Sequence, residues 1–171
     1  FSGETSLKQW YSKVQKGYIH CAQEHAHYYG NCTYDDAATY DSGMFLLRMY
    51  LLTLDPKYKY PVERCLDFVL ESQNPIGGWP MQHKLDLNYS PGLARDFEPA
   101  GYAATATAEM CRNLMRFYRW TGDTKYLARI PDAFEFLESI RYNDAQMKQL
   151  GKSVIPVQIL CPTFVEVGTN R

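Results

Sequence analysis

Apolar residues recur at helical spacing in two separate stretches of the chain. Within each stretch they lie three or four positions apart, which places them on one face of a helix. The first stretch contains Val62, Cys65, Leu66 and Val69, and the second contains Met110, Leu114, Phe117 and Tyr118. The pattern predicts amphipathic helices that bury one side against the rest of the protein.

The two helical stretches belong to an internal duplication with an offset of 68 residues. Residues 46–58 read LLRMYLLTLDPKY, and residues 114–126 read LMRFYRWTGDTKY, with seven of the thirteen positions identical. A fixed-period repeat of this kind indicates one helix–turn–helix unit that occurs twice. Gly122 and Asp123 are suited to end one helix and reverse the chain. Pro61 and Pro131 then predict the first turn of the second helix in each unit.

The segments outside the helices carry different signals. Residues 74–79 (NPIGGW) predict a turn, and residues 154–167 (VIPVQILCPTFVEV) predict one or two short strands or an extended cover. We therefore expect an all-α fold in a single domain over residues 1–171. The arrangement expected is an α/α toroid or an incomplete barrel of helix pairs, with a few short strands in the loops and the C-terminal segment. A plain helix bundle is the alternative.

Composition narrows the classes of partner. The chain is 46% hydrophobic and 22% charged, its formal net charge is −1, and it contains no basic run. A strong field that would select nucleic acid is therefore not expected. No apolar stretch is long enough for a membrane span. We expect a monomer without nucleic-acid or membrane partners. The five cysteines form no CxxC pair and leave the redox compartment open.

An acidic pair is present in only one copy of the repeat. Asp35 and Asp36 precede the first unit, whereas Ala103 and Ala104 stand at the equivalent positions of the second. The pair is therefore not required to form the unit. Its carboxylates could cap the helix that follows, or they could bind a hard cation such as calcium, which prefers oxygen ligands.

Two arginines also carry alternative interpretations. Arg95 stands between the two units in the stretch GLARDFEP, and Arg171 ends the chain in VGTNR. Each could form an ion pair at the surface, as Arg95 could with Asp96 or Glu98. Alternatively, each guanidinium could bind an anionic substrate, because its planar fork matches a carboxylate.

Four motifs in order resemble the family-ten pectate lyases. They are GGWP at residues 77–80, ARDFEP at 94–99, TGDTKYLARIPDAFEFLES at 121–139 and PTFVEVGTNR at 162–171. The resemblance covers most of the chain from about Thr33 onward. It implies a toroid of helix pairs with a groove for polygalacturonate, in a protein that is secreted, periplasmic or on the cell surface. It also implies calcium-assisted β-elimination.

The resemblance assigns roles to individual residues. It implies that Arg95 is the catalytic base and that Arg171, Asn170 and Trp79 bind the substrate. Asp36 matches an aspartate near calcium and substrate, and Asp35 stands beside it as a second metal ligand.

Some alternatives stay open within this resemblance. The TYDDAAT stretch also matches a non-catalytic stretch of the family, which would leave Asp35 and Asp36 with a structural role. The family's domain is longer, so we expect an incomplete toroid. A glycoside hydrolase that uses Glu98 and Asp36 as paired carboxylates is an alternative enzyme. A non-catalytic polysaccharide-binding protein of the same fold is a further alternative.

Overall fold

The structure of the chain is a computed structural model that describes part of its length. The described residues are 8–12, 17–21, 31–34, 37–84, 88–92, 99–152 and 160–168, of which 8–12 and 17–21 are described by backbone alone. The helices are α1 (Ala38–Thr53), α2 (Pro56–Glu71), α3 (Ala104–Thr121), the 3-10 helix η3 (Thr124–Leu127), α4 (Ile130–Ser139) and α5 (Asp144–Gln149). The strands are β1 (Lys8–Ser12), β2 (Gly17–Cys21), β3 (Cys32–Thr33), β4 (Gln82–His83), β5 (Gly101–Ala103) and β6 (Phe164–Glu166).

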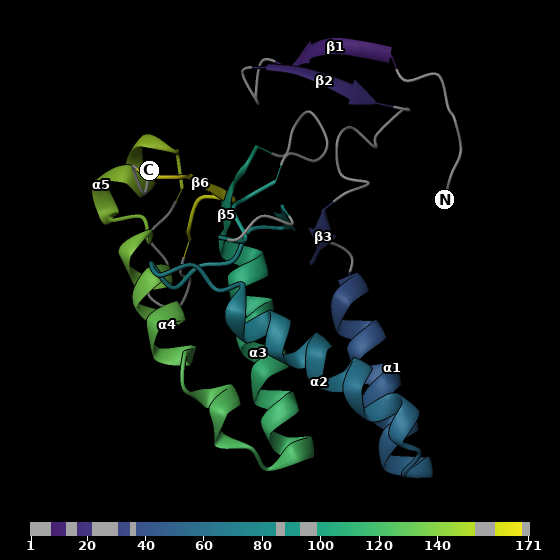
Figure 1. Cartoon of the computed structure of the whole chain (residues 1–171). Coiled ribbons are helices and arrows are strands. Elements are labelled where there is room, and N and C mark those ends of the chain that lie inside the picture. Colours follow the sequence, from purple (N-terminus) through teal and green to yellow (C-terminus); the bar gives the residue numbers. More distant parts are fainter. Residues whose placement is uncertain are drawn as a thin grey trace.

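The described part is mainly helical (Figure 1). Its strands form antiparallel pairs, β1 with β2, β3 with β4 and β5 with β6. The prediction of an all-α fold with a few short strands is therefore confirmed. β6 confirms a short strand near the end of the stretch 154–167, although residues 153–159 lie outside the described part. Within the described residues, no helix combines the length and the apolar character that a bilayer-spanning segment needs.

The internal repeat is visible in the hydrogen bonds that end the first helix of each unit. Leu54 and Gly122 both adopt the left-handed conformation, with φ of 53° and 73°. The N–H of Leu54 donates to the carbonyl of Tyr50, and that of Gly122 to the carbonyl of Tyr118, each over 2.7 Å. Both helices therefore end with the same left-handed cap, although only the second uses glycine.

The start of the next helix repeats as well. The side chains of Asp55 and Asp123 accept from the backbone N–H of Lys57 and Lys125, each over 3.0 Å. An aspartate at this position satisfies one of the free N–H groups of a helix start. The helix-pair units predicted from the repeat are thus confirmed, including the TGDTKY turn.

The second helices of the two units differ, and one predicted boundary was wrong. α2 begins at Pro56, with Pro61 inside it, instead of beginning at Pro61. Pro56 after the Asp55 cap offers a complete helix start. Pro61 then removes only one backbone hydrogen bond, close to the start of the helix. In the second unit the equivalent stretch divides into η3 and α4, with Pro131 in the first turn of α4 as predicted.

The predicted turn at residues 74–79 is also confirmed, and it packs against α4. The N–H of Gly77 donates to the carbonyl of Asn74 over 2.8 Å, and Gly77 has a φ of 97°. A Cβ atom on Gly77 would lie 2.1 Å from the carbonyl oxygen of Asp132, and one on Gly78 would lie 2.8 Å from the ring of Phe136. Glycine is required here because the turn approaches the start of α4 this closely.

Buried apolar side chains from both units form one main core. It contains side chains of α1, α2, α3, α4 and η3 together with Tyr34 and Trp79. A smaller cluster of Tyr102, Phe136, Ile140 and Val165 lies between β5, β6 and α4. The main core fixes the helix pairs, and the smaller cluster ties the C-terminal strand to them.

Candidate functional site

The strand pairs β3–β4 and β5–β6 lie near the N-terminal ends of α1 and α3, and they are linked into one framework (Figure 1). The N–H of Tyr34 donates to the carbonyl of Met81, and the N–H of Gly92 donates to the carbonyl of Gln82, each over 2.8 Å. Pro80 forms an isolated bridge to Tyr102 in β5, which in turn pairs with β6. The described ends of three chain segments, at residues 34, 92 and 168, therefore meet in this framework or close to it.

These three segments contain most of the predicted site residues. Asp35 and Asp36 follow Tyr34, Arg95 lies in the segment 93–98, and Asn170 and Arg171 follow residue 168. All five lie outside the described residues, as does Glu98, which was considered for hydrolysis. What the structure describes is the framework from which these residues extend.

The start of α1 bears on the acidic pair. The N-cap of α1 is Ala37, whose side chain makes no capping hydrogen bond and whose φ is 57°. The left-handed conformation is unfavourable for an alanine, and such strain persists only where surrounding structure imposes it. In the second unit, α3 already begins at Ala104, the equivalent of Asp36. Asp35 and Asp36 thus precede α1, and neither occupies its N-cap.

Trp79 is the one predicted site residue that the structure describes, and its side chain is fully buried. Its indole N–H donates to the carbonyl of Val69, and its backbone N–H donates to Oγ1 of Thr107, each over 3.0 Å. Thr107 in turn donates to the carbonyl of Ala103 over 2.9 Å. Trp79 therefore connects the end of α2 to the start of α3. Its ring has no exposed surface on which a sugar could stack.

An aromatic cluster lies next to these segments. The ring centroids of Tyr34 and Phe68 are 5.7 Å apart, and those of Phe68 and Tyr89 are 5.3 Å apart. The buried ring of His83 lies edge-on to Tyr34 at 5.2 Å. Edge-to-face contacts at such distances are favourable beyond the burial of area alone. The cluster holds residue 34, which precedes the acidic pair, against residues 82–84 and 88–92, which pair antiparallel, precede Arg95 in the chain and are called the hairpin below.

His83 fixes the conformation of this hairpin. Its Nδ1 lies 2.6 Å from the carbonyl oxygen of Tyr89 and must donate, because a carbonyl only accepts. The N–H of Lys84 also donates to the carbonyl of Ser90 over 2.9 Å. Sequence reasoning missed His83, because its partner is a main-chain carbonyl and leaves no pattern of residue types. At the end of the hairpin, a Cβ on Gly92 would lie 2.4 Å from Nδ2 of Asn31.

Four described side chains in or near the framework have raised pKa values. Burial raises the pKa of the Tyr34 phenol well above its ordinary value, and its Oη lies 2.6 Å from Oγ of Ser72. Burial likewise raises the pKa of the Cys32 and Cys65 thiols and raises that of Cys111 to about 11. These thiols are protonated at neutral pH and are poor nucleophiles. Among the described residues, no three His, Cys, Asp or Glu side chains form a group that could hold a metal ion.

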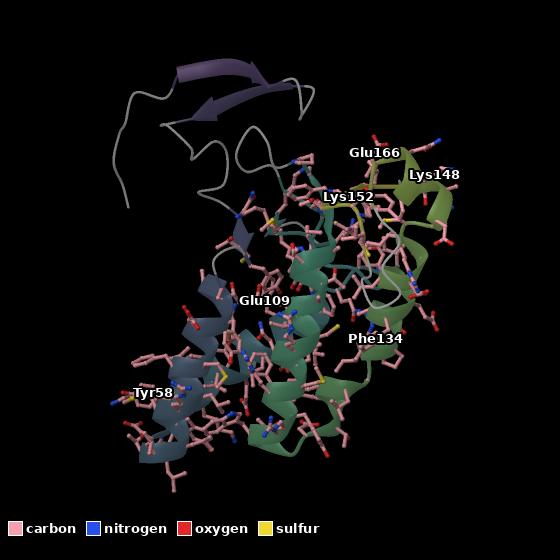
Figure 2. The ribbon with its side chains drawn as sticks, turned by 180° about the vertical axis from the view of Figure 1, so that it is seen from behind. Tyr58, Glu109, Phe134, Lys148, Lys152 and Glu166 are labelled. Carbon is pink, nitrogen blue, oxygen red and sulfur yellow. The ribbon has the colours of Figure 1, made fainter. Side chains whose placement is uncertain are left out.

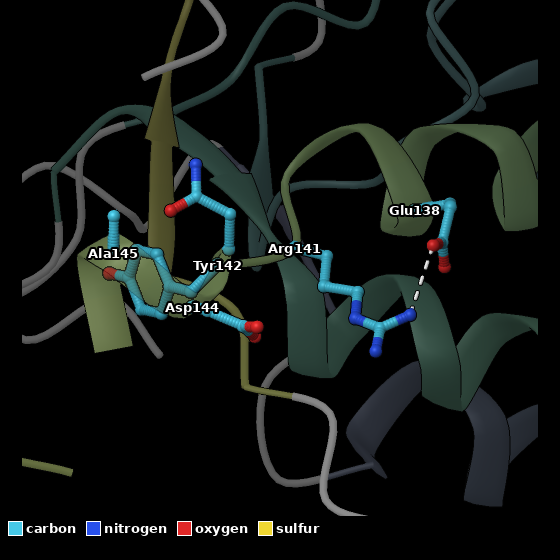
Figure 3. Close-up of a pocket in the computed structure, with 6 residues that line it drawn as sticks. Glu138, Arg141, Tyr142, Asp144 and Ala145 are labelled. Carbon is cyan, nitrogen blue, oxygen red and sulfur yellow. Dashed lines mark hydrogen bonds and ion pairs between the residues drawn. The ribbon is translucent and has the colours of Figure 1, made fainter. Parts of the chain in front are cut away.

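A separate open hollow of about 620 Å³ lies where α4 leads into α5 (Figure 3). Arg141 on its wall already forms an ion pair with Glu138, with Nη1 and Oε1 3.1 Å apart. Asp144 adds another carboxylate, and the side chain of Asn143 caps α5. With two carboxylates and one paired guanidinium, this hollow has no excess positive charge to attract a polyuronate.

The described part thus consists of helix pairs whose short strands bring the described ends of three chain segments together. The sequence model of the pectic acid lyase family matches residues 2–94, which is more than half of the chain. The chain belongs to the pectic acid lyase family. No curated protein and no solved structure matches it.

The matched range revises one prediction. The match begins at residue 2, so the prediction that the resemblance starts near Thr33 was wrong. The matched range includes Asp35, Asp36 and Trp79, and it ends one residue before Arg95. The second unit follows the matched range, and it is linked to the first by the internal repeat.

Proposed function

We propose that the protein is a pectate lyase of family ten that cleaves polygalacturonate by calcium-assisted β-elimination, with Arg95 as the base. The observation that carries the proposal is the match to the pectic acid lyase family. The framework supports it, because the described ends next to Asp35, Arg95 and Asn170 gather around the same short strands. The stacked helix pairs are also compatible with an α/α toroid whose groove lies at this end.

The proposed reaction is balanced without an oxidant or a consumed water molecule. Arg95 in its neutral form accepts the proton from C5 of a galacturonate unit. The electron pair of that C–H bond forms the double bond between C4 and C5, and the bond from C4 to O4 breaks. O4 leaves with the neighbouring sugar and takes up a proton from solvent. The products are an unsaturated end and a new reducing end.

An arginine base requires a specific electrostatic environment, because guanidinium is normally protonated. Positive charge near Arg95 disfavours its protonated form and also stabilises the enolate-like intermediate. Asp35 and Asp36 offer the hard oxygen ligands that calcium prefers, so the donor set fits this ion. Calcium, when bound, supplies positive charge that acidifies the C5 proton. Arg171 and Asn170 bind and orient the substrate carboxylates.

The proposal leaves Trp79 out of the substrate-binding set, because its ring is buried. It also places the protein outside the cytoplasm, in a secreted, periplasmic or cell-surface location. A polymer such as polygalacturonate does not diffuse across a membrane, so an enzyme that acts on it must meet it outside.

The test is incubation with polygalacturonate and calcium, followed by the ultraviolet absorbance of the unsaturated uronate. We expect calcium-dependent growth of absorbance that Arg95→Ala reduces by at least about 100-fold, as for loss of a general base. Arg112→Ala, at an exposed position on α3, is the matched control and should retain full activity. Asp36→Asn should raise the calcium concentration required for half-maximal rate.

The same assay identifies the alternatives. New reducing ends without the chromophore would replace the lyase with a hydrolase, and Glu98→Gln and Asp36→Asn would then be the variants to test. Substrate binding without any product would indicate a polysaccharide-binding protein. Full activity in Arg95→Ala would refute the assignment of the base.

A further inference from the structure

α1 has a largely apolar face that no described element covers completely. The face consists of Ala38, Ser42, Phe45, Met49 and Leu52, which lie three or four residues apart, and we call it the open face; all but the partly buried Met49 are exposed, and Ser42 is its one polar residue. Phe45 is 61% exposed and Leu52 is 82% exposed. Isolated exposed apolar residues are normal, but exposed apolar residues that gather along one side of a helix mark a contact surface.

The internal repeat shows that this face is a packing surface of the unit. The equivalents of its first four residues, 68 positions on, are Ala106, Met110, Asn113 and Phe117 in α3. All four are buried, with exposures of 5% or less. The same helix positions are therefore inside in the second unit and outside in the first.

In the second unit, Phe117 of this surface contacts the first unit. The ring of Phe117 stacks on Tyr40 of α1, with centroids 6.0 Å apart and an interplanar angle of 23°. The guanidinium of Arg116 lies over the same ring at 5.3 Å. A helix thus covers this face where the repeat provides one, and α1 lacks such a neighbour among the described residues.

The charges indicate which helix can cover the open face of α1. The outward side of α3 exposes Arg112, Met115 and Arg119, so head-to-tail stacking of two copies would bury guanidinium groups against Phe45 and Leu52. Burying unpaired charge against apolar side chains is unfavourable. The open face itself contains no charged residue, and it is flanked on one edge by Asp41 and Arg48, seven positions apart.

This arrangement is self-complementary. In a two-fold antiparallel pair of α1 helices, the same edges meet, and an axis near Phe45 places Asp41 of each copy opposite Arg48 of the other. The two Phe45 rings then meet at the centre, with Met49 and Leu52 on either side. We propose that the open face is the interface of a homodimer, in which two α1 helices pack antiparallel. The proposed dimer differs from the monomer that the sequence led us to expect.

The test is the molar mass of the whole chain, measured by light scattering and sedimentation over a range of concentrations. We expect a monomer–dimer equilibrium in the wild type. Phe45→Asp should raise the dimer dissociation constant at least about 100-fold, because each dimer loses two buried rings. Phe134→Asp is the matched control. Phe134 is 60% exposed on α4 (labelled in Figure 2), and both views place α4 and α1 at opposite edges of the helical layer.

A charge exchange tests the register of the pair. Asp41→Arg and Arg48→Asp should each weaken the dimer, and the double variant should restore it, whereas a purely apolar contact would show no such recovery. Circular dichroism checks that each variant keeps its helices.

Three outcomes would overturn the proposal. They are a wild-type monomer at every concentration, a dimer sensitive to Phe134→Asp but not to Phe45→Asp, and a monomer that binds phosphatidylcholine vesicles through Phe45. The last outcome would assign the open face to lipid.

Discussion

Replacing Gly77 or Gly122 by alanine distinguishes two reasons why a position requires glycine: a positive φ and a lack of space for a Cβ atom. Both residues have a positive φ, 97° for Gly77 and 73° for Gly122. A Cβ on Gly122 would meet nothing within 4 Å, whereas a Cβ on Gly77 would lie 2.1 Å from the carbonyl oxygen of Asp132. Gly122→Ala therefore changes backbone strain alone, and Gly77→Ala changes strain and packing together.

The expected magnitudes follow from these contacts. The left-handed conformation costs an alanine about 1–2 kcal/mol, and the reduced freedom of the unfolded chain returns about 0.4–1 kcal/mol. Gly122→Ala should thus lower the free energy of unfolding by about 1 kcal/mol. Gly77→Ala adds a clash with backbone that must move, at about 1–3 kcal/mol. Its total should reach about 2–4 kcal/mol.

Urea unfolding followed by circular dichroism measures both variants against the wild type. The dependence of unfolding free energy on urea should not change, since neither substitution alters the surface exposed on unfolding. If the two variants lost equal stability, the close approach of the 74–79 turn to α4 would be refuted. If Gly122→Ala were neutral, the strain argument for the left-handed cap would fail.

Two further predictions concern buried groups. Thr107→Val should lower the free energy of unfolding by about 1–3 kcal/mol, because the buried N–H of Trp79 loses its acceptor. Thr121→Val, at the exposed end of the same helix, should cost less in the same urea experiment, and equal losses would contradict this role of Thr107. Stability should also fall as pH rises from 9 to about 11, because the Cys111 thiol has an ordinary pKa of 9.0 and a raised pKa of about 11 in the fold, so the unfolded state loses its proton first. Urea unfolding across this pH range should show a shallower fall for Cys111→Ala, and an unchanged slope would exclude Cys111 as a cause.

The candidate site was predictable only in part. The acidic pair stands out by its absence from the other copy of the repeat, and Arg95 stands out by residue type alone; both remain predictions. His83 and Trp79 depend on contacts with main-chain carbonyls, which residue type does not reveal. Trp79 illustrates the difficulty, since a tryptophan after two glycines suits both a sugar-binding surface and a core.

The sequence by itself determined the helix-pair units, because the interactions that end and begin their helices are local. Thr53 and Thr121 each donate to a carbonyl four residues earlier, and Asp55 and Asp123 each accept from an N–H two residues later. Such contacts depend on neighbours in the chain, so the duplicated residues produce duplicated geometry.

Only the tertiary structure decided which face of each unit is buried. Phe45 and Asn113 occupy the same position of the repeat, yet the phenylalanine is exposed and the asparagine is buried. Hydropathy alone would assign the opposite. Burial follows from what packs against a helix: α3 contacts α2, η3, α4 and Tyr40 of α1, whereas no described element covers the open face of α1 completely. The neighbours of a helix in the folded protein, which no local sequence pattern encodes, therefore decide the burial of Phe45 and Asn113 more than their residue types do.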